Sequence, residues 1–144
     1  HIVRVGVSGA GSSEEADTLA RGVANSPLVK TAVYGNDPNV GRIVAALGDA
    51  AGNNNIDIDP ESVTIRLGTE TIFANGVFHL DRDKERRLCD YLRGAAMNPV
   101  ASGFPEHEEQ VRIDVDVALG SADAAVLGTD LSYEYIRENA DYRT

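Results

Sequence analysis

The sequence predicts an α+β fold, a mainly antiparallel sheet with helices packed on one face. Apolar residues at helical spacing occur in runs that are separated by clusters of short strands, an order that disfavours a doubly wound parallel sheet. Asn75-Gly76 lies between two apolar runs and is the strongest hairpin signal in the chain. Val111, Ile113 and Val115 alternate with polar residues, as in a strand with one buried face. A length of 144 residues suits one domain, so we expect residues 1–144 to form a single α+β domain.

The first third of the chain is expected to hold one strand and three helical segments. Alternating β-branched residues predict a strand over Ile2–Ser8, which two glycines end. Serines followed by two glutamates and a helical apolar stripe predict a helix over residues 14–25. Ser26–Gly35 is predicted as a short helix leading into a strand. We expect Asp37 to cap a helix over Pro38–Ala51, because proline favours the first helical position.

The remaining residues predict strands in groups, separated by helices. In chain order they are a strand through Val63, Ile65 and Leu67, two short strands around Asn75-Gly76, a helix over Asp83–Gly94, an irregular loop over Ala95–Glu109, strands over Val111–Val117 and Ala124–Thr129, and a helix over Ser132–Glu138. We expect the last two strands to pair with each other antiparallel, because a short turn joins them.

Composition excludes several classes of partner and site. The 13 basic and 23 acidic residues give a formal charge of −10, which argues against binding to nucleic acid or to anionic membranes. The apolar runs are only a few residues long, so no membrane-spanning helix is predicted. Cys89 is the only cysteine, which excludes an intrachain disulfide and a cysteine-built metal site. A cytoplasmic location is the natural expectation. Because the chain opens directly in a predicted strand, without Met or leader, we expect it to be a piece of a longer protein.

The segment SGAGSSEE has part of the pattern of a dinucleotide-binding turn, in which glycines let a pyrophosphate approach a helix N-terminus. Glu14 stands where the third glycine would be, and its carboxylate would repel a phosphate. We therefore interpret the glycines as a tight strand-to-helix turn and expect no nucleotide cofactor.

Neither metal binding nor a catalytic centre is predicted from residue spacing. Carboxylates occur in two groups, but neither has calcium-loop spacing: Asp57, Asp59 and Glu61, and then Asp114 and Asp116. The histidines show no zinc or triad spacing: they are His1, His79 and His107. Cys89 lies beside Leu88 on a helical apolar stripe and is interpreted as a packed thiol. These residues alone predict only an acidic α+β domain.

Two long segments resemble a known enzyme family. SPLVKTAVYGNDPNVGR (Ser26 to Arg42) and GTDLSYEYIRENADYRT (Gly128 to Thr144) are similar to the β chain of ornithine acetyltransferase, also called glutamate N-acetyltransferase. IDIDPESVTIRLG and VDVALGSADAAVLG are similar to the same family, in the same order. The resemblance therefore covers nearly the whole chain.

The resemblance implies an autoprocessed enzyme of the N-terminal-nucleophile type in arginine biosynthesis. In such enzymes a precursor cleaves itself and exposes a threonine, whose hydroxyl takes the acetyl group from N-acetylornithine and passes it to glutamate. The threonine and its oxyanion donors match no segment of this chain, so no catalytic residue is expected here. The chain would be the C-terminal part of the β chain, inactive alone. Its expected partners are the α chain and the N-terminal part of the β chain, in a heterotetramer of α and β chains, with no cofactor and no metal.

The resemblance also implies two substrate-binding residues. The family's substrate-binding asparagine and terminal threonine match Asn139 and Thr144. An amide offers a donor and acceptors for an amino-acid head group, and a threonine hydroxyl offers both as well. Extending the chain beyond Thr144 is therefore expected to weaken substrate affinity. A contribution to the shape of the site or to a subunit contact is expected from four further residues: Lys30, Thr31, Asp37 and Arg42.

Two functions from different classes follow. The first is a part of the acetyltransferase that lacks the nucleophile and packs against the remainder of the enzyme. The second is a free-standing acidic binding module of the same fold without catalytic activity. Exposed apolar surface would separate them, because a part of a larger enzyme exposes apolar side chains where its partner docks.

Overall fold

The computed structural model of the chain describes residues 1–97 and 109–141. In chain order the elements are β1 (Ile2–Ala10), α1 (Ser13–Asn25), α2 (Pro27–Tyr34), α3 (Val40–Asn53), β2 (Thr64–Leu67), β3 (Glu70–Ala74), β4 (Val77–Phe78), α4 (Arg82–Gly94), β5 (Val111–Asp116), β6 (Ala122–Thr129) and α5 (Tyr133–Ala140). The predicted irregular loop over Ala95–Glu109 lies largely outside the described residues.

The strands form one six-stranded sheet in the order β4-β3-β2-β5-β1-β6. Every neighbouring pair is antiparallel except β1 and β5, which run parallel with Val5 opposite Ile113. The α+β class with a mainly antiparallel sheet is therefore confirmed. The hairpin at Asn75-Gly76 is also present, with both residues at positive φ, as the tight turn requires.

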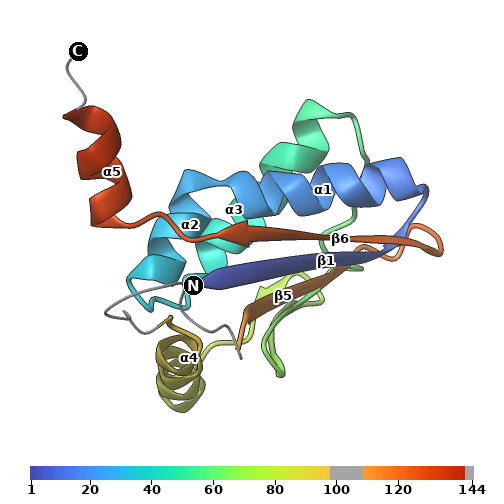
Figure 1. The fold of residues 1–144 in the computed structure, drawn as a ribbon. Coiled ribbons are helices and arrows are strands. Elements are labelled where there is room, and N and C mark those ends of the chain that lie inside the picture. Colours follow the sequence, from blue (N-terminus) through green and yellow to red (C-terminus); the bar gives the residue numbers. More distant parts are fainter. Residues whose placement is uncertain (98–108, 142–144) are drawn as a thin grey trace.

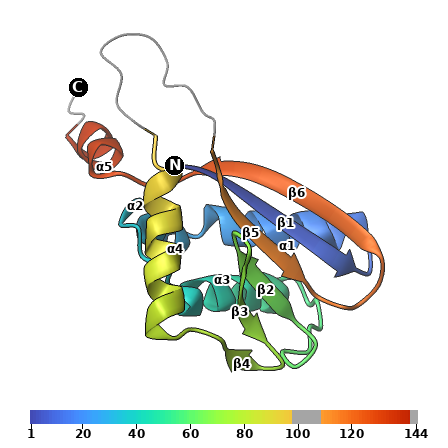
Figure 2. The same cartoon turned by 90° about the horizontal axis from the view of Figure 1, so that it is seen from below.

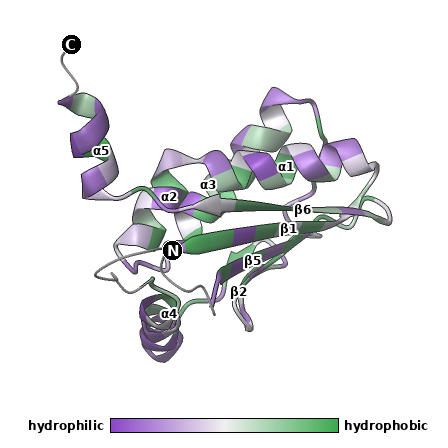
Figure 3. Ribbon diagram, viewed as in Figure 1, coloured by the Kyte–Doolittle hydropathy of each residue, from purple (hydrophilic) through white to green (hydrophobic). Residues whose placement is uncertain are grey.

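The core lies between the sheet and the helices on one of its faces. Figures 1 and 2 show α1 and α3 side by side on this face, whereas α4 runs across one end of the sheet. Val3, Val5 and Val7 of β1 point into this layer and are buried, as are Leu88 and Leu92 of α4. Figure 3 shows the same division, since β1 is largely hydrophobic and the outer side of α4 is hydrophilic. The buried side chains of the alternating strands and of the apolar helical stripes thus form one core.

The opposite face of the sheet carries charge. Arg4 of β1 donates to Asp114 of β5 at 2.9 Å, and Arg112 donates to the same carboxylate at 3.3 Å. Both ion pairs are partly open to solvent, with the Asp114 side chain 34% exposed. In the part of the chain that the structure describes, no helix packs on this face (Figure 2).

Within Ser26–Gly35 the helix α2 extends to Tyr34, and the next element in the chain is the helix α3. The prediction of a helix leading into a strand was therefore wrong. Ser26 caps α2 by accepting a hydrogen bond from the Val29 N–H, and Pro27 occupies the first turn. Val29 and Val33, two β-branched residues of this helix, lie four apart and are both buried. Burial on one helical face here outweighs their β-propensity.

The capping prediction for α3 was also wrong, by two residues. The cap is Asn39, whose side chain accepts a hydrogen bond from the Arg42 N–H at 3.2 Å, and the helix begins at Val40. Asp37 instead accepts from the Asn39 side-chain amide at 3.1 Å, and its carbonyl accepts from the Asn39 backbone N–H. Pro38 therefore sits in a tight turn before the helix and not in its first turn.

β6 pairs with β1 and not with β5, contrary to the prediction. The turn after β5 passes over the end of β1, because the N–H groups of Leu119 and Gly120 both donate to the Gly9 carbonyl, at 2.6 and 2.7 Å. Ala118 takes a positive φ of 53° to make this crossing. β1 is consequently inserted between two strands that are adjacent in sequence.

Tyr91 ties α4 to the start of β5. Its hydroxyl donates to the Gln110 carbonyl at 3.1 Å and accepts from the Arg112 N–H at 2.9 Å. Burial raises the pKa of the Tyr91 phenol above its ordinary value, although the hydrogen bond from Arg112 works in the opposite direction. A raised pKa means that the protonated phenol stabilises the folded state below pH about 10, and that this contribution is lost as the pH rises through the folded-state pKa.

We expect Tyr91→Phe to lower the free energy of unfolding by about 1 kcal/mol, since the ring remains and only the hydrogen bonds are lost. Urea unfolding at neutral pH measures this change. Tyr135→Phe is the matched control, because Tyr135 is 58% exposed on α5. Equal effects of the two substitutions would contradict the structural role of the Tyr91 hydroxyl.

Candidate functional site

The C-terminal arm, residues 130–141, carries one of the two predicted substrate-binding residues. It contains α5, in which no residue is buried, and Figure 1 shows this helix standing away from the rest of the chain. Ser132 caps the helix by accepting from the Tyr135 N–H at 3.1 Å. The arm thus forms a regular helix that is not packed into the core formed by the described residues.

α2 supplies one set of contacts between the arm and the body. The Tyr133 ring meets the Tyr34 ring edge to face, with centroids 5.8 Å apart, and the Tyr34 hydroxyl donates to Glu134 at 3.4 Å. The Leu131 N–H donates to the Lys30 carbonyl at 3.4 Å. Hydrogen bonds from its own backbone N–H and from the Ser132 hydroxyl hold the pKa of Glu134 below its ordinary value. These contacts aim α5 outward from the end of α2.

His1 and Asp130 join the root of the arm to the start of β1. The His1 Nδ1 and an Asp130 carboxylate oxygen lie 2.6 Å apart, and the His1 Nε2 lies 3.0 Å from the Leu92 carbonyl of α4. The His1 side chain is only 4% exposed. This cluster therefore gathers β1, α4 and the arm at one end of the sheet.

The structure places Asn139 on the exposed surface of α5. Its side-chain amide nitrogen donates to the Tyr135 carbonyl one turn earlier, at 2.8 Å. Thr144 lies outside the described residues. The structure therefore brings no described side chain of the body to Asn139, and the substrate-binding roles of Asn139 and Thr144 stay predictions.

The other residues singled out between α2 and α3 hold these helices together. The Arg42 guanidinium donates to the Leu28 carbonyl at 3.0 Å and to the Thr31 hydroxyl at 3.3 Å. The Thr31 hydroxyl in turn donates to the Pro27 carbonyl at 2.9 Å. Lys30 supplies the carbonyl that receives the Leu131 N–H. Arg42 and Thr31 therefore set the position of α2, on which the arm rests.

The remaining candidates have structural explanations. Gly9 has a φ of 71°, and the Gly11 N–H donates to Glu15 at 3.1 Å, so a carboxylate already occupies this helix start. Asp59 accepts from the Glu61 N–H and the Ser62 hydroxyl, both at 3.0 Å. Asp116 accepts from the Ala118 N–H at 3.0 Å.

Within residues 1–97 and 109–141, no group of three or more histidine, cysteine, aspartate or glutamate side chains is arranged to hold a metal ion. The His79 Nε2 lies 3.3 Å from the Ala74 carbonyl oxygen, and Cys89 is partly buried. His107 lies outside the described residues. Among the described helices, none has the length and apolar character that crossing a membrane requires.

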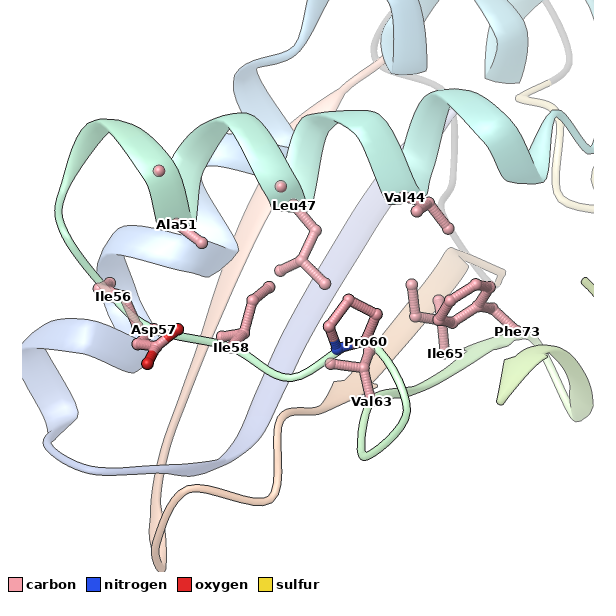
Figure 4. Close-up of a pocket in the computed structure, with 12 residues that line it drawn as sticks. Val44, Leu47, Ala51, Ile56, Asp57, Ile58, Pro60, Val63, Ile65 and Phe73 are labelled. Carbon is pink, nitrogen blue, oxygen red and sulfur yellow. The ribbon is translucent and has the colours of Figure 1, made fainter. Parts of the chain in front are cut away.

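A cavity of about 330 Å³ lies between α3 and the segment that leads into β2. Figure 4 shows Leu47 and Val44 of α3 facing Ile58, Val63 and Phe73, with Asp57 at one end. The side chains that line this cavity are almost all apolar. A substrate site also needs polar groups that converge on the ligand, and this cavity has one carboxylate at its end.

Large apolar side chains are exposed on several elements. They are Leu28 on α2, Leu127 on β6, Tyr133, Tyr135 and Ile136 on α5, Val77, Phe78 and Leu80 on and after β4, and Met97 and Leu119 in connecting segments. Tyr133 is 79% exposed and Leu127 70% exposed. Exposed apolar groups in this number favour a part of a larger assembly over a free-standing module.

Comparison with known proteins identifies a family for this chain, because the model of the ArgJ family matches residues 1–144. The "Arginine biosynthesis bifunctional protein ArgJ" of Bartonella quintana is 37% identical over 144 residues, which are 100% of this chain and 30% of that protein. The protein of the same name from Synechocystis sp. is 38% identical over 143 residues, 99% of this chain and 32% of that protein.

A solved structure matches as well. The crystal structure of the arginine biosynthesis bifunctional protein ArgJ from Bacillus halodurans superposes with a TM-score of 0.80 at 30% identity, covering 98% of this chain and 57% of that one. This chain thus spans about a third of the length of the curated relatives that it matches.

Proposed function

Because the chain belongs to the ArgJ family, we propose that it is the C-terminal part of the β chain of a bifunctional glutamate N-acetyltransferase and ornithine acetyltransferase. It would serve arginine biosynthesis, as the names of its relatives state of them. The observation that carries the proposal is the match over the whole chain to about a third of each relative. The exposed arm supports it, since a helix without buried residues needs another surface to pack on.

In the proposed reaction the nucleophile lies on the rest of the enzyme. A threonine hydroxyl there attacks the acetyl carbonyl of N-acetylornithine, the amide C–N bond breaks, and ornithine leaves as the amine with the hydroxyl proton. The amino group of glutamate then attacks the acyl-threonine ester, releases the threonine hydroxyl and forms N-acetylglutamate. The threonine's own amine acts as the base, and backbone or side-chain donors stabilise each oxyanion.

This chain would supply substrate contacts and not the bond-making step. Its one cysteine lies on α4, and its described histidines contact a carboxylate or carbonyl oxygens, so none forms a nucleophile-base pair. Asn139 and Thr144 are proposed to bind the amino-acid head group shared by donor and acceptor. The amide of Asn139 offers two donors and an acceptor to such a group, once the bond to Tyr135 is exchanged for one to substrate.

The proposed assembly follows from the family. The partners are the α chain and the N-terminal part of the β chain, produced by autocatalytic cleavage and joined in a heterotetramer in the cytoplasm. No metal or cofactor takes part in the proposed reaction, and its substrates are small amino acids. The formal charge of −10 is unsuited to nucleic acid or to an anionic membrane.

The proposal is tested by measuring acetyl transfer from N-acetylornithine to glutamate with three samples. These are this chain alone, the complementary polypeptides alone, and both together after co-purification. We expect turnover only with both, and none when the N-terminal threonine of the complement is replaced by alanine. Activity of this chain alone would overturn the proposal. A stable but inactive complex would instead favour a binding module without catalytic activity.

A further inference from the structure

His1 is enclosed by hydrogen-bond acceptors from two different elements. Nδ1 lies 2.6 Å from an Asp130 oxygen and Nε2 lies 3.0 Å from the Leu92 carbonyl. The His1 side chain is 4% exposed and that of Asp130 is 14% exposed, so water competes little for these bonds.

The imidazolium form satisfies this geometry and the neutral forms do not. A carboxylate and a backbone carbonyl both only accept, and only a doubly protonated ring donates from both nitrogens. Either neutral tautomer would turn one nitrogen lone pair toward an acceptor oxygen. In the imidazolium form the His1–Asp130 contact is a charge-assisted hydrogen bond, which is stronger than a neutral one.

The position of Asp130 in the chain connects the His1–Asp130 pair to the arm. Asp130 directly follows the end of β6, and its N–H donates to the His1 carbonyl at 3.3 Å. Beyond it, the described contacts of the arm with the body are the Leu131 bond to Lys30 and the Tyr34 contacts of Tyr133 and Glu134. The last two are open to solvent. The pair of His1 and Asp130 is thus the innermost side-chain anchor before α5.

We propose that His1 is a positioning residue for substrate binding. Its clamp on Asp130 and Leu92 fixes the direction in which the arm leaves the sheet, and so fixes where Asn139 meets the substrate. His1 itself touches no substrate and acts through the arm. This inference rests on the proposed function for its effect on catalysis, but the clamp itself concerns this chain alone.

Two variants break the clamp with a side chain of similar shape, although phenylalanine is somewhat larger than histidine. Asp130→Asn removes the charge, and His1→Phe removes both ring donors at a buried position. His1→Gln keeps an N–H donor and is the conservative variant. Arg21→Gln is the matched control, because it breaks an ion pair between Arg21 and Asp17 that is exposed on α1, away from the arm.

The first measurement is hydrogen exchange of peptides covering residues 131–141 in the assembled enzyme. We expect hydrogen exchange in Asp130→Asn and His1→Phe to be about tenfold faster or more than in the unsubstituted enzyme. In His1→Gln the exchange rate should return part of the way to that of the unsubstituted enzyme. In Arg21→Gln it should be unchanged. Unchanged exchange in both clamp variants would overturn the proposal. This readout does not depend on activity, so it tests the clamp even if the enzyme transfers no acetyl group and the proposed function fails.

The second measurement is steady-state kinetics of the same variants. We expect KM for N-acetylornithine to rise about tenfold with kcat within about twofold, because the nucleophile is untouched. In an Asn139→Ala background the clamp variants should raise KM no further, since the contact that they misplace is already gone. An undiminished further rise, or faster exchange with an unchanged KM, would refute the positioning role.

Discussion

Leu19→Ala is expected to lower the free energy of unfolding by about 2–5 kcal/mol. Leu19 lies on α1, has no exposed surface and faces the layer in which α1 packs on β1, β6 and α3. Truncation removes buried apolar area and leaves a cavity that a layer between a helix and a sheet cannot fill by side-chain movement alone. Urea unfolding of this chain, monitored by far-ultraviolet circular dichroism, measures the loss.

Leu127→Ala is the control for this prediction. It deletes the same atoms from a leucine of β6 that is 70% exposed and points to the charged face of the sheet. We expect a loss well under 1 kcal/mol, because little apolar surface leaves water there on folding. Comparable losses for the two variants would mean that the helical layer does not form the core of the folded chain.

Asn139→Ala is expected to raise KM for N-acetylornithine about ten- to hundredfold in the assembled enzyme. A hydrogen bond to a charged group contributes about 1.5–3 kcal/mol, and each 1.4 kcal/mol corresponds to about tenfold in affinity. The substitution does not disturb a core, because α5 has no buried residue. Initial-rate kinetics with both substrates measure the change.

Asp49→Asn provides the matched control, since it changes one exposed polar side chain on α3 and should leave KM unaltered. Asn139→Asp is informative as well, because it keeps the size but would repel a substrate carboxylate. An unchanged KM in Asn139→Ala would remove Asn139 from the substrate site and leave the arm as a packing element only.

Local patterns in the sequence predicted the elements well. The alternation over Val111–Val117 and the apolar stripe with Leu88 and Leu92 reappear as β5 and as the buried side of α4. The resemblance to the ornithine acetyltransferase family, based on Ser26–Arg42 and Gly128–Thr144, is confirmed by the match to ArgJ over the whole chain. Local periodicity is reliable because it depends only on which face of an element is buried.

Pairing and capping were harder to predict because they depend on distant groups. β6 is adjacent to β5 in sequence, yet the connecting turn lies across the end of β1, because its N–H groups donate to the Gly9 carbonyl. The cap of α3 is Asn39 and not Asp37, because the carbonyl of Asp37 is engaged in the turn that precedes the helix. The spacing of apolar residues in the sequence does not predict either of these hydrogen-bonding patterns.

The candidate site was only partly visible in the sequence. The resemblance predicted Asn139 as a substrate-binding residue, which stays a prediction, whereas the contacts that anchor the arm were not predicted. His1 and Asp130 are separated by 129 positions, and Tyr34 and Glu134 by 100. A lone histidine and a lone aspartate show no motif, so only the fold brings such pairs together. Thr144 lies outside the described residues, and its role stays a prediction.

In the function that we propose, this chain binds substrate for a nucleophile carried by its partner. The most direct test incubates the co-purified enzyme with N-acetylornithine alone, quenches it with acid and records the intact mass of every polypeptide. We predict one acetyl adduct on the companion that begins with threonine and none on this chain. An acetyl adduct on this chain, or acetyl transfer without any adduct on that threonine, would contradict the proposed division of roles between this chain and its companion.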